Sequence, residues 1–230
     1  GSCCSGHDVY FTTSSDNKNW IEHGPISNLS TGPTVWSNSP KLGTRYVRLI
    51  FRSPSPEPIT VFEVTARGNI TGPVAFRVDA GLDGQPWTAH VDGQGNLWNY
   101  DQNFNTGNET DWPTTAISNT LNPALYRTER WDPSVAPELS YRFPVALGRY
   151  TLRLHFAETY APLFSVGKRV FDVRAQGALV LDNLDVYKEV GANRALVKSI
   201  PITVTNGTFQ LDFGRVVNNP SLRAFELIPQ

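Results

Sequence analysis

The stretch that decides the fold is YTLRLHF, residues 150–156. Its apolar side chains occupy every second position from Tyr150 to Phe156, and the positions between them are polar or charged. Because successive side chains of an extended strand point to opposite faces, this pattern predicts a strand with one face in a core. Residues 208–213, TFQLDF, alternate in the same way. We therefore expect a core that is built between strands.

Turn residues separate many short segments of this kind. Asn206-Gly207 suits a type I′ turn, so a hairpin is predicted between strands at 202–205 and 208–213. Gln176-Gly177 is expected to turn the chain between 170–174 and 178–181, and another turn region lies at 92–96. The other predicted strands cover 9–13, 45–51, 60–66, 76–80, 139–143 and 222–228, and a short helix is expected at 183–190. Short strands with close turns favour an all-β sandwich or jelly roll.

The composition narrows the classes of partner. With 230 residues, of which 40% are hydrophobic, the chain can bury a large core. The 20 Lys and Arg residues are balanced by 21 Asp and Glu residues, so no basic surplus exists to bind nucleic acid. No apolar run is long enough to cross a bilayer. We expect neither a nucleic-acid partner nor membrane insertion.

Two features bear on the cellular compartment. Cys3 and Cys4 are adjacent, so they cannot join distant parts of the chain. They could form an intermolecular bridge or a metal site, or be thiols whose partners lie outside this sequence. Asn-x-Ser/Thr triplets occur at Asn28, Asn69, Asn108 and Asn206. In a secreted glycoprotein these asparagines would mark exposed loops.

From residue 74 to 228 the chain resembles the malectin-like family of carbohydrate-binding domains. The resemblance lies in an ordered series: FRVDAG at 76–81, DQNFNTG at 101–107, LYRTERW at 125–131, LHFAE at 154–158, RVFDV at 169–173, and NP at 219–220 followed by AFE at 224–226. Each motif alone is weak, but their order over two-thirds of the chain is specific. The resemblance implies a malectin-like β-sandwich at 74–230 that binds glycans without catalysis or a cofactor.

The family carries its sugar site on loops at one end of the sandwich. Aromatic rings there stack on the apolar face of a sugar, and polar groups bind its hydroxyls. Matched by motif, Phe104, Trp131 and Tyr160 would be the aromatic residues and Asn218 the polar one. Phe104 could equally be a plug beneath its loop, whereas Trp131 and Tyr160 stand where strands run into loops.

This sequence departs from malectin at the matched positions. Ala161 replaces a second aromatic residue, Asn218 replaces an acid, and Trp131 replaces a tyrosine. Phe164 could compensate for Ala161 if its loop bends back. These changes bear on malectin's diglucose specificity more than on glycan binding in general. Glu129, Arg130 and Glu158 are expected to form a structural framework beneath the loops, and His155 to be solvated or hydrogen-bonded to a neighbour.

Residues 1–68 resemble the second half of a discoidin-type (coagulation-factor C) domain. The resemblance rests on YFTTSSDNKNW at 10–20, RYVRL at 45–49 and FEV at 62–64. It implies a smaller β-rich N-terminal segment. No discoidin ligand residue is carried over, because the recognition loops of that family lie mostly in the missing half.

The sequence shows no Gly-x-Ser-x-Gly nucleophile motif and no His-Glu-x-x-His or Cys-x-x-Cys metal motif. A calcium ion at Asp182 and Asp185 is conceivable, but their spacing alone is no basis for predicting a metal site. We therefore expect a non-catalytic, extracellular or cell-surface glycan-binding module. The alternative is an adhesion or assembly module that contacts other extracellular proteins.

Overall fold

The computed structural model describes residues 8–14, 21–26, 46–52, 75–82, 90–133 and 136–230. The chain separates into two compact units, Gly1–Gly68 and Asn69–Gln230. In the first unit β1 (Asp8–Ser14), β2 (Ile21–Ile26) and β3 (Tyr46–Arg52) form an antiparallel sheet in the order β2-β1-β3. Cys3, Cys4 and the predicted strand at 60–66 lie outside the described residues. The resemblance of residues 1–68 to a discoidin-type domain stays a prediction.

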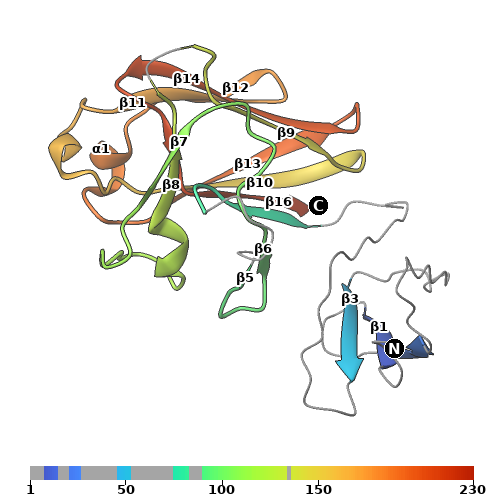
Figure 1. Ribbon diagram of the computed structural model, residues 1–230. Coiled ribbons are helices and arrows are strands. Elements are labelled where there is room, and N and C mark those ends of the chain that lie inside the picture. The colour runs from blue at the N-terminus through green and yellow to red at the C-terminus, as the bar shows by residue number, and fades with distance from the viewer. Residues whose placement is uncertain (1–7, 15–20, 27–45, 53–74, 83–89, 134–135) are drawn as a thin grey trace. The chain divides into compact units, whose positions relative to one another are not determined.

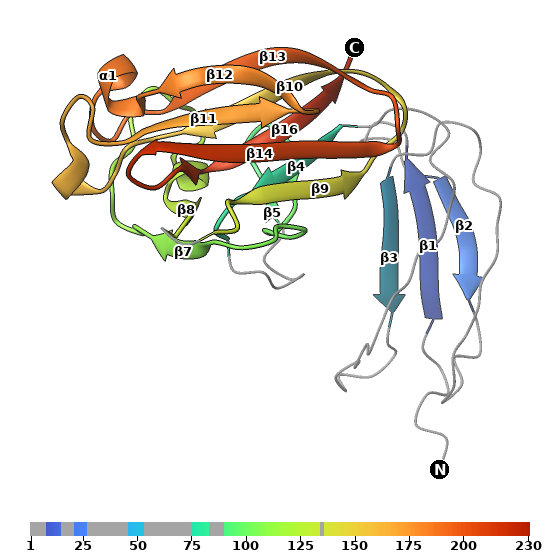
Figure 2. The same ribbon diagram turned by 90° about the horizontal axis from the view of Figure 1, so that it is seen from above.

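The second unit is built on two four-stranded antiparallel sheets, which form the two layers visible in Figures 1 and 2. One sheet has the order β13-β10-β16-β4, and its strands are Leu196–Val204, Gly148–Phe156, Ala224–Pro229 and Phe76–Asp79. The other has the order β12-β11-β14-β9, with strands Ala178–Leu184, Val170–Ala175, Thr208–Val217 and Ser140–Pro144. The predicted all-β sandwich is confirmed.

The core lies between these two layers. The alternate residues Tyr150, Leu152, Leu154 and Phe156 of β10 are almost fully buried, and Phe209, Leu211 and Phe213 of β14 face them in the same cluster. Burying one large apolar side chain stabilises a fold by about 1.5–3 kcal/mol. The alternation in the sequence therefore identified the strands that build the core.

The predicted hairpin at Asn206-Gly207 is wrong. The flanking strands β13 and β14 belong to different sheets, so this turn carries the chain from one layer to the other. A type I′ turn needs positive φ angles at both central residues, and here only Gly207 has one, at 76°. The Asn206 side chain instead accepts a hydrogen bond from the backbone N–H of Thr208 at 3.0 Å.

The other predicted turns are confirmed. Gln176 and Gly177 have φ angles of 52° and 79°, and they join the paired strands β11 and β12. β5 (His90–Val91) and β6 (Leu97–Trp98) form a hairpin around the turn at 92–96. The predicted helix is shorter than expected, since α1 spans only Val186–Val190. Asp185 caps its N-terminus by accepting from the Lys188 N–H at 2.9 Å, while residues 183 and 184 still belong to β12.

Smaller elements cover the edges and the outer face of the first sheet. β15 (Ser221–Leu222), β8 (Thr128–Trp131) and β7 (Asn108–Asp111) form a three-stranded sheet, in that order. The β5–β6 hairpin and the 3-10 turn η2 (Pro123–Tyr126) lie on the side of the β10 sheet that faces away from the second layer (Figure 1). They bury a second cluster there, which includes Trp98, Leu125 and Tyr126. Among the described residues no helix has the length and hydropathy needed to cross a membrane.

Candidate functional site

The short strand β8 brings three of the four sequence-predicted residues to one place. Trp131 ends this strand and pairs with Asn108 of β7 on one side and Ser221 of β15 on the other. Its indole Nε1 donates a hydrogen bond to the Thr110 hydroxyl at 2.9 Å. The ring is half-buried. Trp131 is therefore a held aromatic side chain with part of its surface open.

Asn218 belongs to the loop that leads into β15, whose Ser221 pairs with Trp131. The Asp132 N–H donates to the Pro220 carbonyl at 2.9 Å, which fixes this loop to the chain that leaves Trp131. Asn218 is exposed and has a φ of 59°. Its carboxamide oxygen accepts from the Asn219 N–H at 2.8 Å, so the side-chain N–H₂ group has no partner among the described residues. A free amide at an open loop suits a sugar hydroxyl.

Phe104 is positioned as a packing residue. Its ring is half-buried and lies edge-on to Tyr141, with 6.2 Å between the ring centroids. The Arg130 guanidinium lies 3.6 Å from the centre of the same ring, which is cation–π contact. Arg130 is in turn paired with the buried carboxylate of Asp101. Arg130 covers one face of the Phe104 ring, and this packing favours the role of a plug beneath the loop over that of a sugar-stacking ring.

Tyr160 is 48% exposed and stands at the start of the 3-10 turn η3 (Ala161–Leu163). Its backbone N–H donates to the Glu158 carboxylate at 3.0 Å. The Phe164 ring stacks on Tyr187 of α1, with centroids 6.0 Å apart. Among the described residues Tyr160 makes no direct hydrogen bond or ring contact with Trp131, and a buried network lies beneath both loops.

That network is centred on Arg223, which is 1% exposed. Arg223 interrupts the strand predicted at 222–228, because β15 ends before it and β16 begins after it. Its guanidinium pairs with the Glu129 carboxylate at 2.8 Å and donates to the Ala157 carbonyl at 2.9 Å. Burial lowers the pKa of Arg223, whereas the neighbouring Glu129 carboxylate opposes that shift. A buried cation with this many partners is a rigid framework.

Arg169 extends the framework to the Tyr160 loop. Its Nε lies 2.9 Å from the Glu158 carboxylate, and its Nη1 lies 3.9 Å from that of Glu129. Burial raises the pKa of Glu158, and the Arg169 charge opposes that shift. Glu129 and Glu158 are thus held on arginines, as the sequence predicted for a structural framework, and Arg130 contributes through Asp101 rather than through Glu129.

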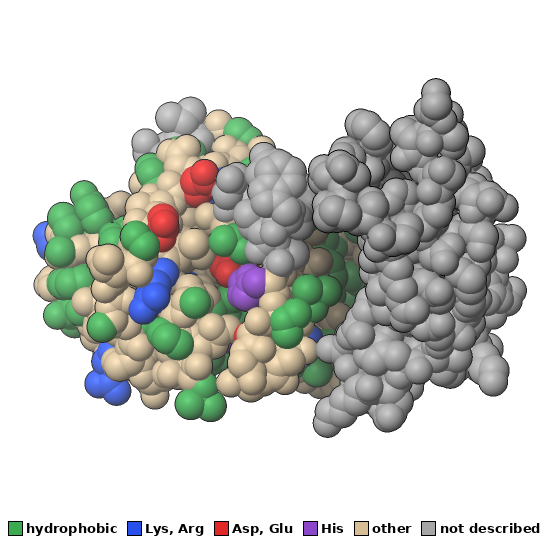
Figure 3. Space-filling model, turned by 60° about the horizontal axis from the view of Figure 1, so that its bottom comes forward, with side chains coloured by type: hydrophobic (Ala, Val, Ile, Leu, Met, Phe, Trp, Pro, Cys, Tyr) green, Lys and Arg blue, Asp and Glu red, His purple; other side chains and the backbone are tan. Residues whose placement is uncertain are grey.

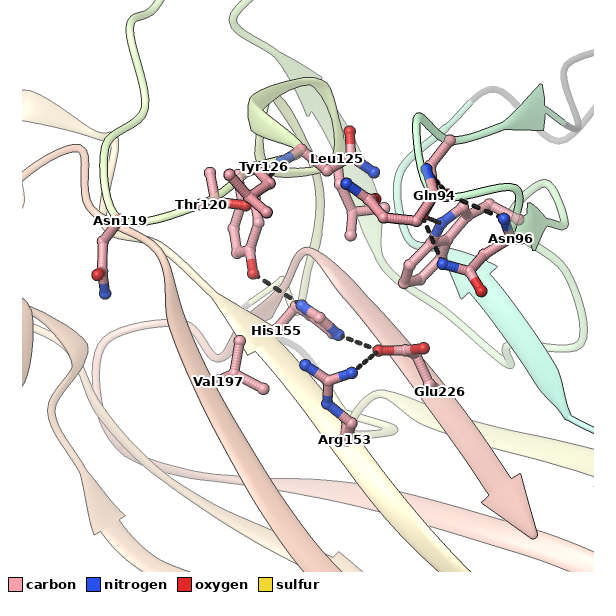
Figure 4. Close-up of a pocket in the computed structure, with 14 residues that line it drawn as sticks. Gln94, Asn96, Asn119, Thr120, Leu125, Tyr126, Arg153, His155, Val197 and Glu226 are labelled. Atoms are coloured by element: carbon pink, nitrogen blue, oxygen red, sulfur yellow. Dashed lines mark hydrogen bonds and ion pairs between the residues drawn. The ribbon is translucent and has the colours of Figure 1, made fainter.

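A separate cleft, which the sequence analysis did not identify, lies on the outer face of the β10 sheet. It has a volume of about 710 Å³. Arg153 and His155 of β10 and Glu226 of β16 form its floor, while the β5–β6 turn and the segment before η2 form its walls (Figure 4). The polar side chains that alternate along β10 were the signal available in the sequence. They could not show that two segments distant in the chain would enclose this face of the sheet.

His155 is hydrogen-bonded and buried, as one of the two sequence alternatives held. Its Nδ1 lies 2.7 Å from the Tyr126 hydroxyl and its Nε2 lies 3.0 Å from the Glu226 carboxylate. Arg77 and Arg153 approach the same carboxylate at 2.7 Å and 3.1 Å. Burial alone would raise the pKa of Glu226, but the hydrogen bond from His155 and the arginine contacts outweigh it and lower that pKa.

The described residues contain no group of three or more His, Cys, Asp or Glu side chains arranged to hold a metal ion. Asp185 accepts hydrogen bonds from the N–H groups of Lys188 and Gly167, at 2.9 Å and 2.6 Å. Asp182 accepts one from the Asn183 side chain at 2.8 Å. Asp185 therefore serves as the N-cap of α1, and Asp182 binds a neighbouring side chain.

Figure 3 shows one face of the molecule, on which the charged side chains of the described residues are few and scattered. Hydrophobic and neutral polar side chains lie between them, and no strongly charged patch forms on this face.

Comparison with known proteins identifies relatives of the second unit. The family model described as the malectin domain matches residues 75–225. Malectin-A of Xenopus laevis is 36% identical over 91 residues, which cover 39% of this chain and 31% of that protein. A probable LRR receptor-like serine/threonine-protein kinase of Arabidopsis thaliana is 36% identical over 94 residues, which cover 38% of this chain and 9% of the kinase.

Solved structures share the fold at lower identity. The extracellular domain of ANXUR2 from Arabidopsis thaliana has a TM-score of 0.58 and 17% identity, covering 67% of this chain and 48% of that chain. A Bacteroides uniformis β-glucuronidase has a TM-score of 0.59 and 20% identity, covering 97% of this chain and 26% of the enzyme. The chain thus spans a minor part of each of these relatives and structures.

Proposed function

This chain belongs to the malectin domain family, and from that premise we propose that it is a non-catalytic module that binds an oligosaccharide on its β8 loops. The observation that carries the proposal is Trp131, whose half-buried indole is fixed by Thr110 on a strand that pairs with the end of the Asn218 loop. An aromatic surface beside a hydrogen-bonding group is what a pyranose requires. Tyr160 would add a second ring at the edge of the same site.

The chemistry of the loops favours binding over catalysis. Hydrolysis of a glycosidic bond needs two carboxyl groups about 5–9.5 Å apart across a cleft. Two carboxylates beneath the loops of the candidate rings, Glu129 and Glu158, are buried and bound to Arg223 and Arg169. These pairs stiffen the base of the loops. The similarity to part of a β-glucuronidase is a similarity of fold. Because a fold does not determine function, we propose a non-catalytic role for this module.

We place the module in a longer extracellular or cell-surface protein. The relatives named as receptor-like kinases, and an extracellular receptor domain of the same fold, support this placement. The chain spans only 9% of that kinase and 31% of a malectin. Among the predicted glycosylation sites, Asn108 and Asn206 are exposed, which suits a secreted glycoprotein. Asn28 and Asn69 lie outside the described residues.

A glycan array tests the proposal. The intact chain is applied beside Trp131→Ala and Tyr160→Ala, and Leu147→Ala serves as the control, since it removes a 61% exposed side chain at the opposite end of β10. We expect selective retention that falls at least tenfold in Trp131→Ala and is unchanged in the control. Retention that survives both aromatic substitutions in folded protein would overturn the site.

A second candidate function is docking of a protein partner at the same end of the sandwich. Several aliphatic side chains there are exposed: Val166 at 60%, Val216 at 48% and Val217 at 43%, beside the loop of Asn218. Adhesion or assembly in an extracellular complex would use such side chains. An array that stays silent with folded protein, combined with a partner whose binding is lost in Val216→Asp, would favour this function.

A further inference from the structure

We propose that the cleft on the outer face of the β10 sheet is a second saccharide site, specific for neutral sugars and separate from the β8 loops. The cleft has a volume of about 710 Å³. Ligand sites in proteins commonly measure about 300–1,000 Å³, so this one can hold more than a single sugar ring. Its floor is strand and its walls are turns, which gives it a rigid base.

The lining includes four carboxamide side chains, those of Gln94, Asn96, Asn119 and Asn122. Figure 4 shows Gln94 and Asn96 on one side of the cleft and Asn119 on the other. Each carboxamide offers both donors and an acceptor, which is also the dual character of a sugar hydroxyl.

Several of these groups remain open to a ligand. The Asn119 N–H₂ group donates to the Ala195 carbonyl at 2.9 Å, so its oxygen remains to accept. The Asn122 Nδ2 is buried and has no acceptor among the described residues, a state that costs free energy until an acceptor is supplied. The Gln94 side chain makes no hydrogen bond with the described residues. The fold holds these side chains in position and leaves part of their hydrogen-bonding capacity unused.

The charged side chains of the lining bear on the class of ligand. The carboxylates and the arginine of the lining are Asp92, Glu226 and Arg153. Glu226 is paired with Arg153 at 3.1 Å and also with Arg77 at 2.7 Å. The pKa of Asp92 would rise through burial alone, but hydrogen bonds from Trp98 and Asn96 outweigh burial and lower it. Because Glu226 and Asp92 match the two arginine charges, the lining has no excess of positive charge, and a neutral ligand is favoured over an acidic one.

The cleft also offers apolar surface. Val197 of β13 is 37% exposed on the floor, and Leu121 is 89% exposed on the rim. Val197 is directly opposite His155 in the β10–β13 register, so the apolar surface adjoins the hydrogen-bonded floor. Arg153 contacts Glu226 through one nitrogen, and its side chain is 39% exposed beside them. Apolar surface next to hydrogen-bonding groups fits a sugar, which has a C–H face and a rim of hydroxyls.

The test fills the cleft without breaking its hydrogen bonds. Val197→Trp places an indole on the floor at a strand position that tolerates aromatic residues. Leu179→Trp is the matched control, because Leu179 is 43% exposed on β12, in the other sheet. Gln94→Ala is a second cleft variant that removes no side-chain hydrogen bond with the described residues, and it serves if Val197→Trp fails to fold. Trp131→Ala reports on the β8 loops independently.

The probe is an array of neutral di- to tetrasaccharides with uronate-containing counterparts, read with the full chain and the folded variants. We expect at least one neutral glycan that Trp131→Ala and Leu179→Trp retain, that Val197→Trp loses at least tenfold, and that Gln94→Ala loses severalfold. Glycan binding that depends on Trp131 alone would overturn the cleft site and leave the proposed function standing. Retention of only acidic glycans through the cleft, or of no glycan that the cleft variants affect, would also overturn it.

Discussion

At the scale of single residues, chemical type alone did not decide which aromatic side chains are open. Phe104 and Trp131 both fit the family's aromatic positions, yet Arg130 covers the face of one ring and Thr110 holds the edge of the other. The difference depends on where Arg130 is directed by Asp101, some thirty residues away in the chain. Sequence motifs could name both residues, but only packing separates a plug from an open ring.

Asp79 gives a prediction at this scale. It is 3% exposed and accepts a hydrogen bond from the Thr128 hydroxyl at 2.8 Å. Burial raises the pKa of its carboxyl group from 3.8 to about 8. The folded state therefore holds this proton more tightly than the unfolded state does. The free energy of unfolding should fall by up to about 1.4 kcal/mol per pH unit from pH 3.8 to about pH 8. The stability that the protonated Asp79 carboxyl contributes is fully present only below pH 3.8.

Asp79→Asn removes this titration while keeping an acceptor for Thr128. We expect the variant to match the parent near pH 5, where the parent carboxyl is protonated, and to gain stability relative to it as the pH rises to 8. Thermal unfolding at pH 5, 6.5 and 8 measures the difference. A difference in melting temperature that stays constant across these values would show that Asp79 is ionised throughout.

At the scale of elements, period-two alternation predicted the core strands and their inward faces. It could not predict which strands pair, because both layers present alternating apolar residues to one core. Asn206-Gly207 was read as a hairpin and is a crossing between sheets, whereas Gln176-Gly177 forms the hairpin with two positive φ angles. The candidate site depends on the short strands β7, β8 and β15, which are held by pairing across distant parts of the chain and carry no alternation of their own.

The β7–β8 pair gives the next prediction. Thr110 of β7 accepts the Trp131 indole N–H across the pair, so Thr110→Val should release the ring. A hydrogen bond of this kind contributes about 0.5–1.5 kcal/mol, which corresponds to a loss of about two- to tenfold in glycan affinity if Trp131 stacks on the sugar. Glycan titration measures it, and Thr110→Ser is the control that keeps the acceptor.

Thr110 is also the third residue of the glycosylation triplet at Asn108, which lies opposite Trp131. The titration should therefore use protein made without N-glycosylation, so that only the hydrogen bond changes. Equal affinity in Thr110→Val and Thr110→Ser would mean that the orientation of the indole does not depend on this bond.

At the scale of the whole molecule, the main question is how much of the chain the proposed module needs. The described members of the sandwich core lie within residues 76–227, and both four-stranded sheets are formed by strands of the second unit. The family match also lies inside that unit. A unit that has its own core, and whose strands pair with one another, is expected to fold by itself.

A chain that begins at Asn69 should therefore unfold in one cooperative transition, within about 2–4 °C of the corresponding transition in the full chain, the shift that about 1 kcal/mol produces in a domain of this size. Calorimetry measures the transition, and the glycan array should give the same retained glycans at the same strength. A shortened chain that aggregates would show that residues 1–68 complete the fold. A shortened chain that folds but loses glycans would assign part of the sugar contact to residues 1–68 and would turn the proposed module into a two-unit binder.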